Sequence, residues 1–230
     1  MDLNTKHVQR NTLPQQVIEH IILLLREGKI KSGDKLPSEL ELMTKFGVSR
    51  PVLREALGSL ETLEIINRKP RGGTFINEKV GSFPFRAMLA LSINNVSAII
   101  EARMTLELGL VTLAAEKITE KHLESLQAAI QGIEQSPNNN YGSFDKKFHR
   151  IIAESVDNPV VEGMIDSLLI AHERTDSLIP YREPSITIEH HTAIYEALKN
   201  HNPIESFKQM YNHLSFVREK VLYHYNTQTF

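Results

Sequence analysis

The stretch SELELMTKFGVSRPVLREALGSLETLEIINRKPRGGTFI, residues 38–76, decides the fold of the amino-terminal part of the chain. It begins with a capping box, in which Ser38 caps a helix and Glu41 reaches back to the amide group of Ser38. Leu40 and Met43 are expected to mark the buried face of this helix. Gly47 can adopt the left-handed conformation that ends a helix, because it has no Cβ atom.

A second helix and a hairpin follow this break. Ser49 stands where a capping residue is expected, and Pro51 is tolerated in a first turn because amide groups there have no intrahelical partner. The apolar residues of this helix recur at helical spacing and predict one buried stripe: Val52, Leu53, Ala56, Leu57 and Leu60. Two short strands are then predicted over 65–68 and 74–76, joined by the basic, glycine-rich turn 69–73. The segment therefore predicts a helix, a tight turn, a helix and a hairpin.

The polar residues of the second helix suggest contact with nucleic acid. Arg50 and Arg54 are four residues apart, so both project from one helix face. The guanidinium group matches the O6 and N7 atoms of guanine or a phosphate, and a helix amino terminus adds backbone donors for phosphate. The alternative is that Arg54 forms a surface ion pair with Glu55 or Glu61.

Residues 12–76 resemble the winged helix-turn-helix domain of the GntR family of bacterial transcription regulators. The matching phrases are LPSELEL (36–42), FGVSRPVLREAL (46–57) and GGTFI (72–76). The resemblance implies that Arg50 and Arg54 contact operator DNA and that Gly73 lies at the tip of the wing. In this chain Arg71 occupies the position of the first glycine of the family's wing. The residues expected at the DNA are Ser38, Ser49, Arg50, Arg54, Arg71 and Gly73.

Composition and charge indicate a cytoplasmic protein of two parts. The 230 residues include no cysteine, which excludes disulfides and thiolate ligands and fits a reducing compartment. The polar start of the chain has no apolar signal core, and the longest aliphatic run, 21–25, is far too short to cross a bilayer. Residues 1–77 hold 12 Lys and Arg against 9 Asp and Glu, whereas residues 78–230 hold 14 against 19. A mildly basic module is thus joined to an acidic one, which DNA would repel.

The fold class predicted is mainly α: a winged helix-turn-helix domain over 1–77, a linker over 78–82 and an all-α antiparallel helical bundle over 83–230. Candidate helix caps in the bundle are Thr119, Ser143, Asn158 and Asn202, the last two each followed by proline. The helices predicted there are 83–91, 97–117, 120–134, 144–156, 159–178, 186–200 and 203–225. Short loops between consecutive helices favour antiparallel neighbours.

Four residues of the bundle form a possible metal site. Asp145 and His149 are spaced four apart, so both can face one ion. His191 and His213 lie on the last two helices and can face each other if these pack antiparallel. One carboxylate and three imidazoles suit Zn, Ni or a similar ion better than Ca or Mg. The residue spacing leaves two alternatives open: these histidines can be ordinary bundle residues, and His190 can take the place of His191.

Residues 93–224 resemble the FCD ligand-binding domain of the FadR subfamily of these regulators. The matching phrases are EARMTLE (101–107), FDKKFHRIIAES (144–155), EHHTAIYEAL (189–198) and MYNHL (210–214). The resemblance implies that the metal ligands are Asp145, His149, His191 and His213. The set is complete, which favours a metal-dependent member of the subfamily. Arg103 could simply pair with Glu107 one turn on, but the resemblance implies that it helps to bind the carboxylate of an effector.

Together these observations predict a ligand-responsive transcription regulator that is not an enzyme. It is expected to be a homodimer that binds a two-fold symmetric operator in double-stranded DNA. Repression is expected rather than activation. The effector would be a small organic acid, such as a hydroxy acid or a sugar acid, bound at a divalent transition metal, Zn or Ni. Helix 83–91 and the segment 77–82 are the expected couplers. The alternatives are a metal-dependent hydrolase with a DNA-binding appendage and a regulator that senses acyl ligands without metal.

Overall fold

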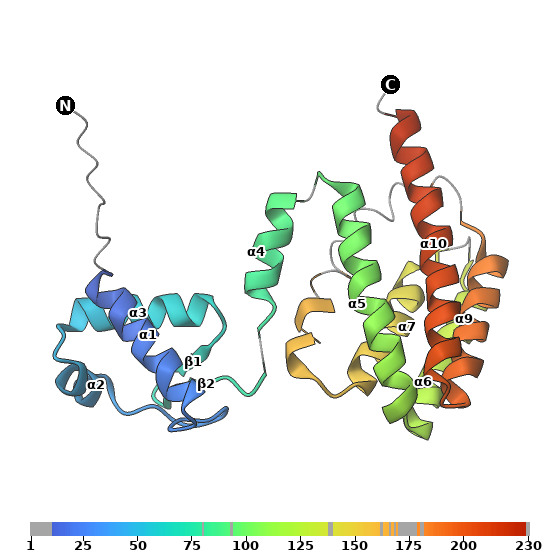
Figure 1. The fold of residues 1–230 in the computed structure, drawn as a ribbon. Helices are drawn as coiled ribbons and strands as arrows, with labels where there is room; N and C mark the ends of the chain where they lie inside the picture. The colour runs from blue at the N-terminus through green and yellow to red at the C-terminus, as the bar shows by residue number, and fades with distance from the viewer. Residues whose placement is uncertain are drawn as a thin grey trace. The chain divides into compact units, whose positions relative to one another are not determined.

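The computed structural model describes residues 11–79, 81–92, 94–137, 140–161, 163–165, 167, 169, 179 and 182–228. The chain divides into two compact units, Met1–Phe83 and Pro84–Phe230. Each unit has its own cluster of buried apolar side chains. The predicted mainly α fold, with a winged helix-turn-helix unit followed by an all-α unit, is confirmed (Figure 1).

The first unit consists of helices and one hairpin in the predicted order. Its elements are α1 (Leu13–Arg26), α2 (Glu39–Phe46), α3 (Arg50–Thr62), β1 (Ile66–Lys69) and β2 (Gly73–Ile76). Helix α1 was not predicted separately, and it packs against α3. The core is formed by aliphatic side chains from every element: Val17, Ile21, Leu36, Leu42, Leu53, Ala56, Leu57, Leu60, Ile66 and Ile76.

Local signals set the bounds of α2, as expected, but not its buried face. The backbone amide of Ser38 donates to Glu41 Oε2 at 2.8 Å, and the amide of Glu41 donates to Ser38 Oγ at 3.3 Å. Gly47 ends the helix with φ 64°. The expectation for Leu40 is wrong: 66% of this residue is exposed, whereas Leu42 is buried. The α2 helix is only eight residues long, so its rotation is set by packing against the rest of the unit rather than by its own apolar pattern.

Helix α3 and the hairpin also follow the prediction with local corrections. Ser49 occupies the N-cap position, but its side chain makes no capping hydrogen bond. The apolar stripe of α3 is buried at all of its predicted residues except Val52, which is half-buried. Strand β1 pairs with β2 antiparallel, from Ile66 opposite Ile76 to Lys69 opposite Gly73. Both strands lie within one residue of their predicted bounds.

The second unit is all-α in its described residues. Its helices are α4 (Phe83–Ser92), α5 (Val96–Lys117), α6 (Glu120–Glu134), α7 (Gly142–Ser155), α9 (Pro184–Lys199) and α10 (Pro203–Gln228). The predicted cap Ser143 is wrong: α7 already begins at Gly142, and Tyr141 holds the N-cap position without a side-chain hydrogen bond. Thr119 caps α6 as predicted, and Asn202 Oδ1 accepts from the amide of Glu205 at 3.1 Å. The predicted helix 159–178 lies largely outside the described residues.

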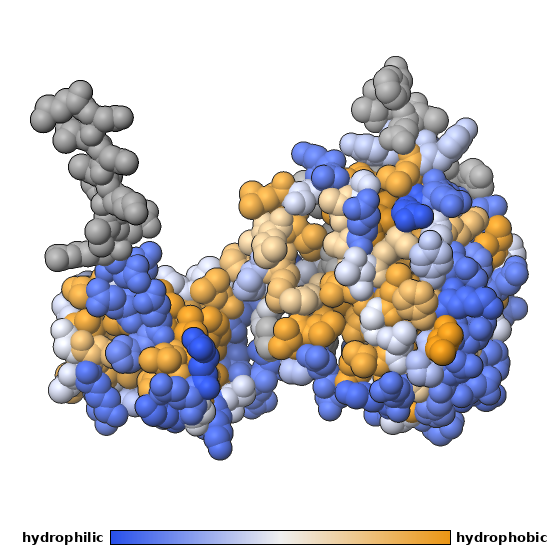
Figure 2. All heavy atoms as spheres, viewed as in Figure 1, coloured by the Kyte–Doolittle hydropathy of each residue, from blue (hydrophilic) through white to orange (hydrophobic). Residues whose placement is uncertain are grey.

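Helix α5 is the central element of this unit. It is apolar on nearly every side, which is typical of a helix surrounded by others. Helix α10 packs against α5 and α9, while α7 packs against α5 and α6. Figure 2 shows hydrophobic side chains gathered over α4 and the adjoining part of α5, where Met88 and Leu91 are exposed. Among the described residues no helix is both long enough and apolar enough to cross a membrane.

Replacing Gly47 by alanine tests the turn that joins α2 to α3. A Cβ atom there would meet no atom within 4 Å, so the cost arises from the left-handed backbone alone. We expect Gly47→Ala to lower the free energy of unfolding of the first unit by about 1–2 kcal/mol. The control is Gly58→Ala inside α3, which also meets no atom within 4 Å and should stabilise by roughly 0.5–1 kcal/mol. Urea unfolding checks both values, and equal effects of the two changes would contradict this account.

Candidate functional site

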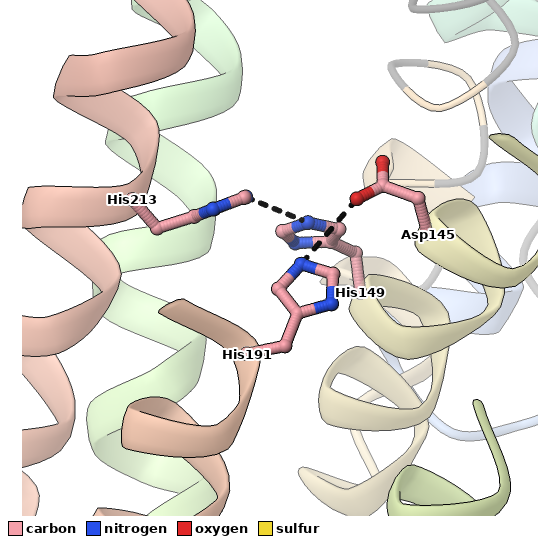
Figure 3. A group of neighbouring side chains, drawn as sticks. All are labelled: Asp145, His149, His191 and His213. Carbon is pink, nitrogen blue, oxygen red and sulfur yellow. Dashed lines mark hydrogen bonds and ion pairs between the residues drawn. The ribbon is translucent and has the colours of Figure 1, made fainter. Parts of the chain in front are cut away.

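Three helices of the second unit bring the four predicted metal-binding side chains together. Asp145 and His149 come from α7, His191 from α9 and His213 from α10 (Figure 3). One potential ligand atom from each residue lies within 4.8 Å of the other three. The i, i+4 spacing places the first two on one face of α7, and the packing of α9 and α10 supplies the others. We call these four residues the histidine–aspartate cluster.

The cluster fits a divalent transition metal. His149 Nε2 lies 3.2 Å from His213 Nε2, and His191 Nε2 lies 3.3 Å from Asp145 Oδ1. Neighbouring ligand atoms on one tetrahedral zinc ion are about 3.3 Å apart at zinc–ligand distances near 2 Å. All three histidines are buried, and the only polar contact of the His191 ring among the described residues is this ion-pair contact of Nε2 with Asp145, which lacks hydrogen-bond geometry. Buried polar atoms in proteins normally have partners, and an ion held between these four groups would supply one.

Burial keeps the imidazoles of His191 and His213 in the neutral form that binds metal. It lowers the pKa of His191 to about 3, although the charge of Asp145 opposes this shift. Burial also lowers the pKa of His213 well below its usual range, and the neighbouring His191 and His149 add to this effect. Metal ligation requires the neutral ring. Both side chains therefore carry an available lone pair at neutral pH.

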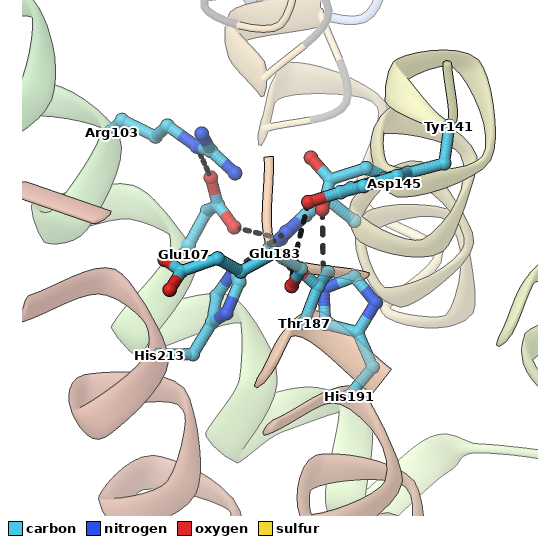
Figure 4. Close-up of polar contacts among 9 residues, drawn as sticks. Arg103, Glu107, Tyr141, Asp145, Glu183, Thr187, His191 and His213 are labelled. Atoms are coloured by element: carbon cyan, nitrogen blue, oxygen red, sulfur yellow. Dashed lines mark hydrogen bonds and ion pairs between the residues drawn. The ribbon is translucent and has the colours of Figure 1, made fainter. Parts of the chain in front are cut away.

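A buried carboxylate adjoins the cluster. Arg103 Nε–H donates to Glu107 Oε1, and the other oxygen of Glu107 contacts His149 Nδ1. Figure 4 shows the Glu107 carboxylate between the guanidinium group and the histidines. Burial alone would raise the pKa of Glu107, but the charge of Arg103 and the contacts with His149 and Arg103 outweigh this effect and lower it to about 2. The carboxylate is therefore ionised at every physiological pH.

The ion pair of Arg103 with Glu107, which the sequence had left as an alternative, is thus present. Only 5% of Arg103 is exposed, so its side chain lies inside the bundle beside the cluster. The contact of Glu107 with His149 was not predicted. A usable signal was the position of a carboxylate within the apolar sequence 99–113, because buried carboxylates are rare unless paired.

Two hydroxyl groups and His190, the sequence alternative to His191, also lie near the histidine–aspartate cluster. Tyr141 Oη and Thr187 Oγ1 are 2.9 Å apart, and both side chains lie beside Asp145 (Figure 4). Neither was predicted, because a tyrosine in a polar loop carries no signal of its own. His190 is only partly buried and packs edge-on against the rings of His213 and Phe216. It is not among the four clustered residues.

In the first unit, the predicted DNA-contacting residues lie on α2, α3 and the wing. Arg50 and Arg54 are exposed on α3. The Ser38 hydroxyl donates to Glu41 Oε2 at 2.8 Å, so it is engaged in the helix cap. A surface groove runs between the start of α2 and the wing, and its basic lining residues are Lys35, Lys45, Arg68, Lys69 and Arg71.

Local contacts leave Arg54 accessible and fix the tip of the wing. Glu61, the acid considered as a partner of Arg54, instead accepts from Arg68 Nε at 2.7 Å. Arg71 adopts a left-handed backbone with φ 59°, a conformation that glycine would take without strain. Gly73 has φ 105°, and a Cβ atom there would lie 2.7 Å from Lys35 Cε. The Lys35 side chain could move aside, so it is the positive φ that favours glycine at residue 73.

Comparison with known proteins identifies both units. Residues 13–76 match the family model described as bacterial regulatory proteins, gntR family, and residues 98–216 match the FCD domain. The chain is 59% identical over 221 residues to the HTH-type transcriptional regulator YcbG of Bacillus subtilis (strain 168), covering 96% of this chain and 95% of YcbG. It is 28% identical to the HTH-type transcriptional repressor NanR of Enterobacter sp. (strain 638), over 94% of this chain and 87% of NanR.

A solved structure supports the fold. That of Streptococcus agalactiae GntR superposes with a TM-score of 0.66 at 24% identity, over 90% of this chain and 99% of that one. These relatives are transcriptional regulators, which confirms the prediction that the chain is not an enzyme and removes the hydrolase alternative.

The depressed pKa values of His191 and His213 predict how stability depends on pH in the metal-free protein. Below pH 6.5 the unfolded chain takes up protons that the folded imidazoles do not accept, so folding becomes less favourable as pH falls toward 5. Each histidine should contribute at most about 1.4 kcal/mol per pH unit. The lowered pKa of Glu107 acts only below its unfolded value of 4.5, outside this range. Urea unfolding in the presence of a chelator, at pH values from 5 to 7.5, measures how the free energy of unfolding depends on pH. The variant His213→Gln should show a weaker dependence than the wild type. A free energy of unfolding that does not change with pH would contradict the prediction.

Proposed function

We propose, from the premise that this chain belongs to the GntR family of bacterial regulatory proteins and carries an FCD domain, that it is a transcription regulator gated by a metal-bound organic acid. The histidine–aspartate cluster would hold the ion, the first unit would read operator DNA, and effector binding would change operator affinity. The single observation that carries the sensing part is the convergence of four buried or half-buried ligand groups from three helices.

The chemistry of the cluster favours zinc or nickel. Imidazole nitrogens and one carboxylate oxygen are ligands that such ions accept, whereas calcium and magnesium prefer oxygen alone. A bound ion would supply Lewis-acid positions for the oxygens of a small acid. The chain's own residues hold the ion and define the space around it. A hydroxy acid or a sugar acid fits such a centre, because its carboxylate and adjacent hydroxyl can bind together.

Arg103 and the nearby hydroxyl groups would provide specificity. The guanidinium group carries five N–H donors in a planar fork, and contact with Glu107 Oε1 uses the one on Nε. A carboxylate ligand is recognised well by such a fork. Tyr141 and Thr187, beside Asp145, can donate to or accept from hydroxyl groups of the effector. We therefore assign effector binding to Arg103, with these two hydroxyls as further contacts.

A metal-free acyl sensor is the remaining alternative. An apolar cavity between α4 and α5 is lined by Phe85, Met88, Leu89, Ile99 and Leu106, among others. It could accept an acyl chain, but its lining residues within the described part of the chain include no charged group for an acyl carboxylate or phosphate. This alternative would also leave the buried histidines and Glu107 without a role, although buried polar groups are costly. The metal-dependent function accounts for more of the structure.

We propose that six residues of the first unit contact operator DNA: Ser38, Ser49, Arg50, Arg54, Arg71 and Gly73. Exposure of the two α3 arginines and the basic groove beside the wing support it. A homodimer on a two-fold operator follows from the symmetry of such sites. We propose that the protein represses transcription, because the relative NanR is named as a transcriptional repressor.

Effector control requires different affinities for two states of the protein. An acid bound at the cluster can change operator affinity only by the ratio of its own affinities for the DNA-competent and DNA-incompetent states. We propose that α4 and the segment 77–82 transmit the change. The direct test is operator affinity of metal-loaded protein across a panel of hydroxy acids and sugar acids, on a duplex that the protein selects from random sequences. Unchanged affinity throughout the panel would exclude this mechanism.

Removing one imidazole tests the metal assignment. We expect the purified protein to carry close to one ion per chain, and His213→Ala to lower metal affinity at least 10-fold because one ligand is lost. His190→Ala is the matched control, since His190 is a neighbouring histidine outside the four clustered residues, and it should retain the metal. Elemental analysis after dialysis measures both. Equal metal content in His213→Ala and the wild type would overturn the assignment.

Removing one guanidinium group tests the DNA surface. Arg54→Ala should weaken binding to the selected duplex by about 1–3 kcal/mol if it contacts a base edge, and should relax sequence preference at one position. Arg26→Ala removes the same charge from an exposed residue at the end of α1 and serves as the control. Fluorescence anisotropy at fixed salt measures both. A similar loss on all sequences would instead indicate a phosphate contact.

A further inference from the structure

We infer that Glu107 is the positioning residue of the metal centre: it orients His149 toward the ion and links that ligand to Arg103. The inference rests on the proposed metal function and concerns a residue outside the four clustered ones. Glu107 belongs to α5, a helix that contributes no group to the histidine–aspartate cluster. It nevertheless touches the cluster directly.

The contacts of His149 determine which of its ring nitrogens can bind an ion. Nδ1 contacts the Glu107 carboxylate, and Nε2 faces His213 Nε2 at 3.2 Å. The Glu107 carboxylate is paired with the Arg103 guanidinium and can only accept, so its close contact with His149 requires the ring proton to lie on Nδ1. In the neutral ring Nε2 then has its lone pair directed into the cluster. A carboxylate behind a metal-binding histidine acts in this way, fixing the tautomer and making the ligand more basic.

The second carboxylate oxygen of Glu107 connects His149 with Arg103, the residue proposed to bind the effector. Arg103 Nε–H donates to Oε1, so one carboxylate holds an arginine on one side and a histidine on the other. The solvent-exposed fraction of the side chain is 6% for Arg103, 3% for Glu107 and 0% for His149. Polar contacts in a chain of groups this deeply buried strengthen one another. An effector that forms hydrogen bonds with the guanidinium group of Arg103 would therefore change the contact between Glu107 and His149.

An ion pair with no role beyond folding is the competing explanation. The two explanations differ in what happens when both charges are removed. A folding role predicts that the uncharged pair behaves like the wild type, because no buried charge is left without its partner. A positioning role predicts that metal binding stays weak, because His149 still lacks its carboxylate.

The experiment measures zinc affinity of metal-stripped, full-length protein by competition with a chromophoric chelator. We expect Glu107→Gln to bind zinc 10–100-fold more weakly than the wild type. Glu101→Gln is the matched control, because it removes the same charge from an exposed residue of the same helix, and it should bind zinc as the wild type does. Unchanged affinity in Glu107→Gln would refute the positioning role.

The double variant Arg103→Met, Glu107→Gln covers the case in which the single variant folds poorly. Its metal-free unfolding midpoint should return toward that of the wild type, while its zinc affinity stays 10–100-fold reduced. Recovery of wild-type zinc affinity in the double variant would identify a folding role only and reject the inference.

A spectroscopic readout separates orientation from stability. In the zinc-loaded wild type, the Nδ1 proton of His149 should give a slowly exchanging, far-downfield NMR signal, because it is donated to a buried carboxylate. In the double variant this signal should move upfield or exchange with solvent. If wild-type protein bound no zinc at all, the proposed function itself would fail. If it bound zinc and Glu107→Gln bound it equally, only the role of Glu107 would fail.

Discussion

The second unit depends on the burial of charged and polar groups inside a helical bundle. An ionised carboxylate in an apolar interior is costly unless other groups compensate it. Glu107 is compensated by Arg103 on its own helix and by His149 on α7. This requirement fixes how α5 and α7 face each other. The cluster then adds α9 and α10, so that four helices must meet at one small polar centre.

This centre lies within the buried interior of the unit. The apolar side chains around it form one continuous cluster that includes residues from α5, α6, α7, α9 and α10. A close-packed interior transmits small displacements because side chains have few alternative positions. A ligand that changes the hydrogen bonding of Arg103 and Glu107 therefore acts on several helices at once. This makes the bundle suited to the sensing role that we propose.

The first unit is organised differently, since its polar groups lie at the surface and its core is purely aliphatic. Capping residues and left-handed residues, among them Gly47 and Arg71, set the lengths and directions of its elements. This small unit holds a rigid arrangement of helix and wing, and the exposed arginines of α3 are presented by that scaffold. Arg71 places a cation in the turn of the wing, on a left-handed backbone.

The sequence alone determined what depends on neighbouring residues. The Ser38 capping box, the Gly47 helix end, the α3 stripe and most helix bounds follow from interactions within one or two turns. The local cap signal at Ser143 did not mark the start of α7, and in the short helix α2 tertiary packing rather than the local pattern decided that Leu40 is exposed. The resemblance singled out Asp145, His149, His191 and His213, but their proximity depends on how α7, α9 and α10 pack. The contact between Glu107 and His149 joins residues 42 positions apart on different helices, and no periodicity within one helix can express such a contact.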